Sequence, residues 1–423
     1  MKEALARVFY SALLRLVTPL YLLRLWRRGA KEPAYRQSLG ERLGFYRNAP
    51  GQGWVWVHAV SLGETLAAAA LVDELRTRQP GLRLLLTCST ATGREAGRDL
   101  LRERDVQCWL PFDTPGAVQR FFRHWQPAVG VLMETEIWPN LLHFAPCPMV
   151  LANARLSERS ARRGRRFAAL LYPAARRIRL ALAQTEADAQ RMRATGAPDV
   201  RVMGNLKYEL AVDEAVLARG RAWRQRLGRP VLLLAVSREG EETMLLQAWA
   251  KVATRGKPLL LIVPRHPQRF DEVAELVHAA GLKLARRSSW GTEPNPESLM
   301  ADAWLGDSMR EMPLYYGMSD VALLGGSFAP LGGQNLIQAA ACGCPLVMGP
   351  HTFNFAEASR LAEEAGAAQR VTDMDEGLSA GLELCQTPVR QAKKAAAAQA
   401  FAAAHRGAAA RMAQAVAVFL PQP

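Results

Sequence analysis

The chain has 423 residues, which is too long for one ordinary hydrophobic core and predicts two domains. Its 54 Lys and Arg residues outnumber its 39 Asp and Glu residues, and the net charge of +15 favours an anionic partner: a nucleic acid, an acidic lipid surface or a phosphorylated substrate. The 49% of hydrophobic residues excludes a mainly disordered chain, and no helix-turn-helix, zinc-finger or RNP-like pattern supports nucleic acid as the partner.

The N-terminal segment is apolar and aromatic over residues 4–26, and basic residues follow it. Arg7, Arg15, Pro19 and Arg24 interrupt it, so we expect no uncharged run long enough to span a bilayer. A helix over residues 1–30 that lies in the membrane interface, with its arginines reaching toward headgroups, fits this pattern better. The alternative is a helix that packs on the protein's own first domain.

Strands and helices alternate along the rest of the chain. Short apolar runs predict strands at 55–60, 82–88, 128–133, 149–152, 180–184 and 200–203, with helices between them, such as 65–79 and 92–103. A polar helical stretch at 208–229 interrupts the alternation, which restarts with strands at 231–236, 259–263, 282–285, 321–324 and 345–348. This order predicts two parallel sheets, in domains 31–210 and 211–390, whose strand ends face a cleft, followed by a C-terminal helix over 391–423.

The segment 306–355 is the richest in glycine-bearing turns, with GGS, GGQN and GPHTFNF after or between its strands. Loops at the carboxyl ends of parallel strands bind ligands, and glycines let backbone amides approach an anion. We therefore predict a nucleotide-sugar or phosphate cradle here, with a helix over 335–342. The alternative for any single glycine is an ordinary turn in a βαβ unit.

Charged side chains follow several strands of the first domain. Glu64 ends the sequence HAVSLGE at a predicted helix N-terminus, which should keep it ionised and available as a general base; the alternative is a carboxylate that only satisfies the helix dipole. Glu134 and Glu136 lie two apart and should point the same way from an extended strand, which raises the pKa of at least one. Lys207 closes the domain, where it could meet an anionic leaving group or only solvent.

The second domain carries candidate anion-binding turns at 237–242 and at Pro264 and Arg265, whose guanidinium could grip a phosphate. Asp373 and Asp375 match a two-aspartate pattern for a metal–diphosphate, but helix capping explains them better. No Walker loop, dinucleotide glycine fingerprint, nucleophile elbow or HExxH motif is present, and we predict neither a cofactor nor a metal. The six cysteines lack regular spacing and are expected to be reduced thiols.

Taken together, these motifs resemble the family of 3-deoxy-D-manno-octulosonic acid (Kdo) transferases of lipid A assembly. The resemblance runs almost end to end, through TPLYLLRLWRRG, GERLGFY, HAVSLGE, METEIWPN, NARLS, GNLKY, EGEE, PRHPQRF, GDSM, GGS and MGPHTFNF. It implies a GT-B glycosyltransferase, with two Rossmann-like domains facing a central cleft and an N-terminal membrane-associated helix. It also implies transfer of Kdo from CMP-Kdo to the lipid A precursor lipid IVA, at the cytoplasmic face of the cell inner membrane.

The resemblance also implies roles for single residues. Glu64 matches the family's proton acceptor, and Glu134 and Lys207 match positions that stabilise the transition state. The matches to the CMP-contacting segments are Pro264, Arg265, Met309, Arg310, Glu311, Asn335, Leu336, Ile337 and Gln338. Direct displacement by a hydroxyl that Glu64 has activated would invert the anomeric centre.

One departure from the family pattern concerns the donor site. The family commonly ends its last CMP-contacting block with a glutamate, whereas this chain has Gln338. An amide can accept a hydrogen bond from a ribose hydroxyl but loses the strength that a charge gives. Two alternatives therefore stay open: a GT-B enzyme that uses another nucleotide-sugar, and an inactive relative that only binds lipid or nucleotide.

Overall fold

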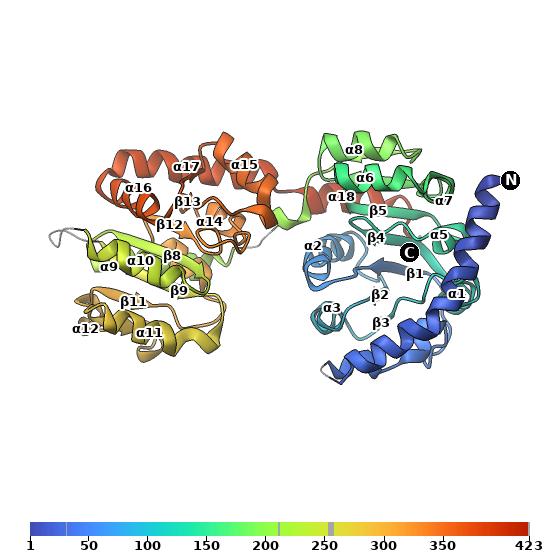
Figure 1. Cartoon of the computed structure of the whole chain (residues 1–423), viewed down its shortest axis with the longest axis horizontal. Helices are drawn as coiled ribbons and strands as arrows, with labels where there is room; N and C mark the ends of the chain where they lie inside the picture. The colour runs from blue at the N-terminus through green and yellow to red at the C-terminus, as the bar shows by residue number, and fades with distance from the viewer. Residues whose placement is uncertain (31, 210–211, 253–257, 422–423) are drawn as a thin grey trace. The chain divides into compact units, whose positions relative to one another are not determined.

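The computed structural model describes residues 1–30, 32–209, 212–252 and 258–421 (Figure 1). Its contacts divide the chain into two compact units. Unit 1 consists of Met1–Glu209 and Arg406–Pro423, and unit 2 is Leu210–His405. Each unit has its own sheet and its own core, so each is described separately.

Unit 1 is built on a parallel sheet of seven strands in the order β3-β2-β1-β4-β5-β6-β7. Its strands are β1 (Trp54–His58), β2 (Leu84–Cys88), β3 (Val106–Trp109), β4 (Pro127–Met133), β5 (Met149–Ala154), β6 (Leu180–Ala183) and β7 (Val200–Val202). Val55 and Val57 of β1 belong to one buried cluster, whereas Trp54 and Trp56 belong to another. Both faces of the sheet are therefore covered, as expected for strands with continuous apolar runs.

The helices of unit 1 lie on both faces of this sheet. They are α1 (Lys2–Arg28), α2 (Leu62–Arg78), α3 (Ala91–Gly97), α4 (Pro115–Trp125), α5 (Pro139–Phe144), α6 (Glu158–Arg165), α7 (Ala168–Ala175), α8 (Glu186–Arg193) and α18 (Ala408–Ala417). The last helix returns from the end of the chain and packs its Met412 and Val416 into the same cluster as Leu71 of α2.

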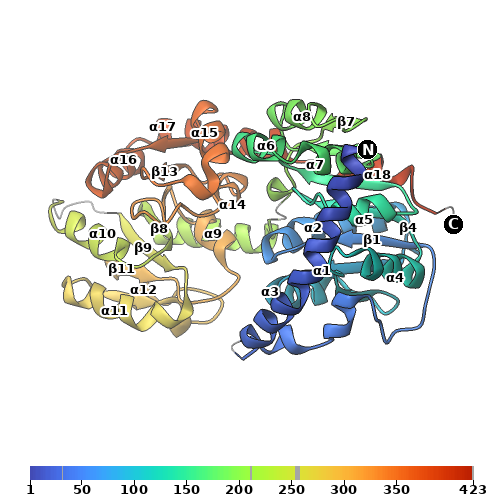
Figure 2. The same cartoon turned by 45° about the vertical axis from the view of Figure 1, so that its right-hand side comes forward.

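Helix α1 lies along unit 1 beside α5 and α7, as Figure 2 shows. One face is anchored there: the Ser11 hydroxyl donates a hydrogen bond to Asn140 Oδ1 at 3.1 Å, and Leu25 packs with Tyr35 and Trp109. The remaining apolar side chains are mostly exposed, including Phe9 at 72%. By length and composition alone, α1 is long and apolar enough to cross a membrane. We did not expect this from the sequence, because arginines interrupt the apolar segment.

Unit 2 repeats the architecture with a parallel sheet of seven strands in the order β10-β11-β9-β8-β12-β13-β14. Its strands are β8 (Val231–Ser237), β9 (Leu259–Pro264), β10 (Leu284–Arg286), β11 (Ala303–Leu305), β12 (Val321–Leu324), β13 (Leu346–Met348) and β14 (Ala368–Arg370). Its helices are α9 (Glu214–Leu227), α10 (Glu241–Ala250), α11 (Phe270–Ala279), α12 (Pro296–Leu299), α13 (Met312–Gly317), α14 (Ile337–Ala341), α15 (Ala356–Glu364), α16 (Met374–Gln386) and α17 (Pro388–His405). Two parallel α/β sheets confirm the predicted fold class.

Every predicted strand overlaps an observed one, and three observed strands, β3, β11 and β14, were missed. They are three or four residues long. The expected helix over 92–103 ends already at Gly97, and the expected C-terminal helix is two helices that belong to different units. Asp373 caps α16, with its Oδ1 accepting the Glu376 backbone N–H at 2.9 Å, which confirms the capping interpretation. None of the six cysteines forms a disulfide with another described residue.

Candidate active site

The carboxyl ends of β1 and β4 form the topological switch point of the unit 1 sheet. Strands β2 and β3 lie beyond β1, and β5, β6 and β7 lie beyond β4, so the connections from these two strands lead away in opposite directions. Open α/β sheets bind their ligands outside such a point. Glu64 follows β1 in the first turn of α2, and Glu134 directly follows β4, so both predicted carboxylates lie at this edge.

Glu64 is held by reciprocal hydrogen bonds at the start of α2. Its carboxylate accepts the Val60 backbone N–H at 2.9 Å and the Ser61 hydroxyl at 3.0 Å, and Ser61 is the N-cap of the helix. Burial raises the pKa of Glu64; these two hydrogen bonds oppose the shift, nearby Glu134 adds to it, and Lys207 opposes it. From its position at a helix N-terminus, we predicted that Glu64 would ionise readily. Burial has the larger effect on its pKa, because it removes water from the carboxylate.

Glu134 and Lys207 form an ion pair beside Glu64. The Lys207 Nζ lies 3.3 Å from Glu134 Oε1. Lys207 is in a short 3-10 helix, Leu206–Tyr208, whose Leu206 N–H donates to Asn153 Oδ1 at 3.0 Å, and this bond ties the segment to the end of β5. Glu134 and Asn153 both have positive φ, at 57° and 51°, a strained conformation that often marks functional sites. The structure thus brings the three predicted catalytic residues of unit 1 together.

Glu136 and His58 extend this cluster; Glu136 was expected beside Glu134, whereas His58 was not predicted. The expected extended strand through Glu134 and Glu136 is wrong, because β4 ends at Met133 and a turn follows. Glu136 Oε2 accepts the Trp138 indole N–H at 2.6 Å and lies 3.8 Å from His58 Nε2. Burial raises the pKa of Glu136 to about 7, with a smaller contribution from Glu64 and Glu134, which agrees with the predicted rise for one carboxylate.

His58 is fully buried, and burial lowers its pKa to about 4. Its Nδ1 lies 2.9 Å from Thr87 Oγ1, whereas its Nε2 has no hydrogen-bond partner among the described residues. A buried neutral imidazole therefore faces Glu136. The sequence signal that could have identified it is its position as the last residue of β1, next to the switch point.

The predicted CMP-contacting residues all lie in unit 2, at the end of β9 or after β9, β11 and β12. Pro264 is the buried last residue of β9, and Arg265 after it is exposed. The backbone N–H of Arg265 donates to the Ser237 carbonyl at 2.9 Å. Met309 and Arg310 are exposed, and Arg310 has φ of 64°. These residues follow the carboxyl ends of their strands, where a ligand would be expected.

Glu311 is already engaged by two arginines. Its carboxylate pairs with Arg219 at 2.7 Å and with Arg287 at 3.0 Å, and the Ser308 hydroxyl donates to it at 2.5 Å. Burial acts to raise the pKa of Glu311, but the bonds from Ser308 and Arg287 and the charge of Arg219 outweigh it, so the pKa is lowered. Glu311 is therefore an ionised, fixed acceptor.

The segment from Asn335 to Gln338 begins α14. The Asn335 side chain accepts the backbone N–H of Ile337, the first residue of this short helix, at 3.0 Å. Leu336 and Ile337 are buried, so only their backbone groups could contact a ligand. Gln338 is partly exposed, as an amide that binds a ligand must be.

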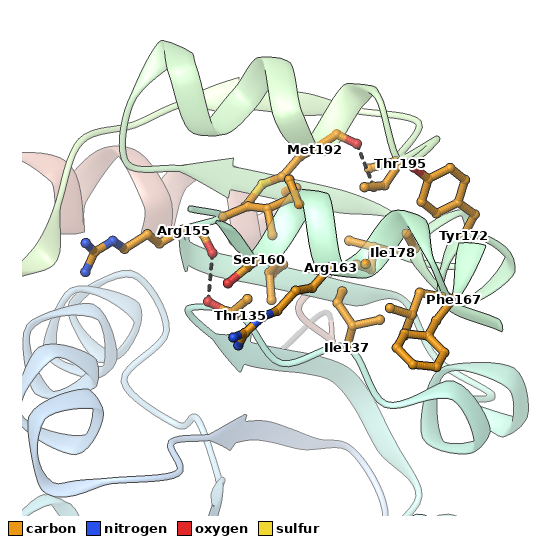
Figure 3. A pocket seen from close by; sticks show the side chains of 18 residues that line it. Thr135, Ile137, Arg155, Ser160, Arg163, Phe167, Tyr172, Ile178, Met192 and Thr195 are labelled. Carbon is orange, nitrogen blue, oxygen red and sulfur yellow. Dashed lines mark hydrogen bonds between the residues drawn. The ribbon is translucent and has the colours of Figure 1, made fainter. Parts of the chain in front are cut away.

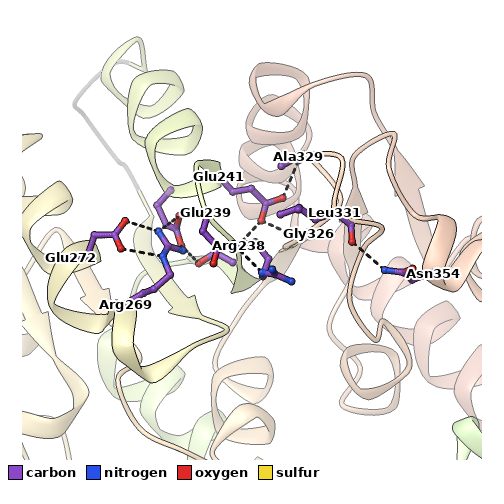
Figure 4. A network of polar contacts seen from close by, with 11 residues as sticks. Arg238, Glu239, Glu241, Arg269, Glu272, Gly326, Ala329, Leu331 and Asn354 are labelled. Carbon is purple, nitrogen blue, oxygen red and sulfur yellow. Dashed lines mark hydrogen bonds and ion pairs between the residues drawn. The ribbon is translucent and has the colours of Figure 1, made fainter. Parts of the chain in front are cut away.

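The glycine-rich loop after β12 is held by an internal carboxylate (Figure 4). Glu241, fully buried at the start of α10, accepts backbone N–H groups of Gly326 at 2.7 Å, Phe328 at 3.0 Å, Ala329 at 3.2 Å and Arg238 at 2.9 Å. These amides were expected to cradle an external anion. They instead surround Glu241, which joins the loops that follow β8 and β12 at the switch point of the unit 2 sheet.

Comparisons with known proteins identify the family. A family model described as 3-Deoxy-D-manno-octulosonic-acid transferase (kdotransferase) matches residues 37–210. The chain is 46% identical to the 3-deoxy-D-manno-octulosonic acid transferase of Bordetella pertussis, over 96% of this chain and 97% of that protein. It is 37% identical to the enzyme of the same name from Haemophilus influenzae, over 89% and 90% of the two chains. The chain belongs to the Kdo transferase family.

Similarity among solved structures agrees with this fold. A glycosyltransferase from Rickettsia africae matches with a TM-score of 0.55 at 9% identity, covering 87% of this chain and 98% of that one. At this level of identity the match supports the fold alone, a GT-B-like pair of α/β domains. As a member of the Kdo transferase family, the protein is a glycosyltransferase.

Proposed function

We propose that this Kdo transferase moves Kdo from CMP-Kdo to lipid IVA, the disaccharide precursor of lipid A, and releases CMP. The cluster of Glu64, Glu134 and Lys207 is the observation that carries the proposal. A partly buried carboxylate with a raised pKa, beside a cation, suits proton transfer from a hydroxyl at neutral pH. We take Kdo as the transferred sugar because the chain belongs to the Kdo transferase family.

The proposed reaction is a single displacement. The acceptor hydroxyl oxygen forms a bond to the anomeric carbon of Kdo, its proton passes to Glu64, and the bond from that carbon to the CMP phosphate breaks. Because the attack comes opposite the leaving group, the anomeric centre inverts. Lys207 offsets negative charge in this region, and Glu134 orients its ammonium through their 3.3 Å contact.

CMP binding is assigned to the unit 2 segments at Pro264 and Arg265, at 309–311 and at 335–338. Arg265 is exposed at the carboxyl end of β9, and a guanidinium can bind a phosphate with two parallel hydrogen bonds. CMP-Kdo has a single phosphate, so cationic side chains and helix ends can neutralise it.

We place the protein at a membrane surface on the basis of α1, and its family suggests the cytoplasmic face of the inner membrane. Many of its apolar side chains are exposed, among them Leu16 at 75% and Leu20 at 67%, whereas Leu25 is buried in unit 1. A helix fixed to its own domain along one face and apolar on the other suits a membrane surface. The net charge of +15 favours anionic lipid.

The test is the variant Glu64→Gln in the full chain. It should lower transfer from CMP-Kdo to lipid IVA by about 10²–10⁴-fold, because the amide cannot accept the proton. CMP binding, measured by calorimetry, should not change. Asp73→Asn, at an exposed position of the same helix, is the matched control and should retain full activity. Full activity of Glu64→Gln would exclude it as the base.

The two alternatives are separated by the same assay with the unaltered protein. An enzyme for another nucleotide-sugar should turn over UDP-sugars and leave CMP-Kdo intact. An inactive relative, which Gln338 favours because the amide weakens donor binding, should release no CMP under any lipid condition. CMP release that depends on lipid IVA contradicts both alternatives.

A further inference from the structure

An apolar cavity of about 360 Å³ lies in unit 1 between α6, α7 and the strands β5 and β6 (Figure 3). Its walls include Ile137, Leu171, Tyr172 and Met192, and the Phe167 ring is 62% exposed beside it. This volume lies within the range of ligand sites in proteins. A cavity with apolar walls and an exposed aromatic side chain fits a hydrocarbon better than a sugar or a nucleotide.

A dense positive charge lies beside the cavity. We call it the arginine cluster: Arg155, Arg159, Arg162, Arg163, Arg165 and Arg166, all of them exposed. Arg155 and Arg163 line the cavity itself. In the described part of the chain, no acidic side chain forms an ion pair with any of the six. Unpaired arginines at the rim of an apolar cavity complement a ligand that has both a hydrocarbon chain and phosphate groups.

The cavity is close to the carboxylate cluster. Thr135 and Ile137, which line it, alternate in the chain with Glu134 and Glu136. The Thr135 hydroxyl donates to the Arg155 carbonyl at 2.7 Å, and this bond fixes the turn to the segment before α6. A ligand whose tail fills the cavity would therefore place its polar end near the proposed base.

Helix α7 links the cavity to the membrane-associating helix. Leu171 and Tyr172 face the cavity, whereas Leu170 and Pro173 of the same helix line a separate pocket with Ala4 of α1. Arg176, directly after α7, pairs with Glu3 of α1 at 3.4 Å. Because α1 packs on α7, the cavity lies near the surface that we assign to the membrane.

We propose that this cavity binds one acyl chain of the phosphorylated glycolipid acceptor, and that the arginine cluster binds a phosphate of the same molecule. The inference rests on the proposed function. If it is correct, the acyl chain is part of what the protein recognises in its acceptor. An acceptor without acyl chains should then bind more weakly, although the reaction centre is unchanged.

The test fills the cavity with Gly164→Trp in the full chain. A Cβ at Gly164 would have its nearest neighbour, Leu171 Cδ1, at 3.7 Å, an ordinary contact, so the side chain can grow toward the cavity without a backbone clash. Ala169→Trp, at an exposed position of α7, is the matched control. Phe167→Ser is a second variant, and it poses little risk to folding because the ring is exposed.

Steady-state transfer is measured with lipid IVA and with a disaccharide phosphate that has no acyl chains. Gly164→Trp and Phe167→Ser should each raise the KM for lipid IVA by about tenfold or more, because apolar contacts with the acceptor are lost. Transfer to the chain-free acceptor and the KM for CMP-Kdo should stay unchanged in both variants. Ala169→Trp should match the unaltered protein throughout.

Each remaining outcome has a distinct meaning. If the unaltered protein releases no CMP with lipid IVA, the proposed function fails, whatever the variants do. If it does transfer Kdo but both variants keep its KM for lipid IVA, the cavity inference is overturned. If vesicles of phosphatidylglycerol and phosphatidylcholine raise the KM of the unaltered protein to that of Gly164→Trp, the cavity holds bulk lipid, which also overturns it.

Discussion

Replacing Glu241 by glutamine should loosen the glycine-rich loop of unit 2. The Glu241 carboxylate accepts four backbone N–H groups, three of them from Gly326, Phe328 and Ala329. Glutamine keeps one acceptor oxygen and puts a donor in place of the other, so about two of these buried N–H groups lose their partner. Each such loss costs about 1–3 kcal/mol, so the free energy of opening the loop should fall by about 2–6 kcal/mol.

Hydrogen exchange followed by mass spectrometry measures this change directly. Peptides that cover the loop should exchange at least about 30-fold faster in Glu241→Gln, since exchange reports the local opening free energy. Glu239→Gln is the matched control: Glu239 is two residues away, and its side chain is 56% exposed, so exchange should not change. Equal exchange in Glu241→Gln and the unaltered protein would refute the view that this carboxylate holds the loop.

Two further predictions concern unit 1. Glu136→Gln should stabilise the protein by about 1–3 kcal/mol at pH 8 and have no such effect at pH 4, measured by urea unfolding. Folding raises the pKa of the Glu136 carboxyl group from 4.5 to about 7. The favourable contribution of this group to the free energy of unfolding is therefore complete below pH 4.5, and it is lost as the pH rises through 7. Serine at Phe9, Leu16 and Leu20 should weaken binding to anionic vesicles by about 10³-fold, because three exposed apolar side chains no longer insert.

Each of these two predictions has an outcome that would contradict it. A pH-independent effect of Glu136→Gln would contradict the burial argument. Serine at Met300 and Val389, which are 78% and 84% exposed in unit 2, should leave vesicle binding unchanged. Equal binding by the α1 variant and the unaltered protein would show that the basic surface alone attracts the membrane.

The local sequence was enough to predict the elements with long apolar runs. Strands such as β1, with sequence WVWVH, and β8, with sequence VLLLAVS, are buried along almost their whole length and were found from composition alone. Strands β11 and β14 have three residues each and were missed, because their pairing with β9 and β13 defines them, and no local pattern does. Glu64 and Glu134 were identified because each follows such a run.

The sequence by itself determined which side chains follow the strands, because a parallel α/β order places them at one edge of a sheet. Only the tertiary structure decided their chemical state. Burial raises the pKa of Glu64 and Glu136, and it turns His58 into a neutral group beside them. The loop amides that seemed free for a ligand are bound to Glu241. Desolvation and hydrogen bonding depend on residues far apart in the chain, and local sequence does not encode those distances.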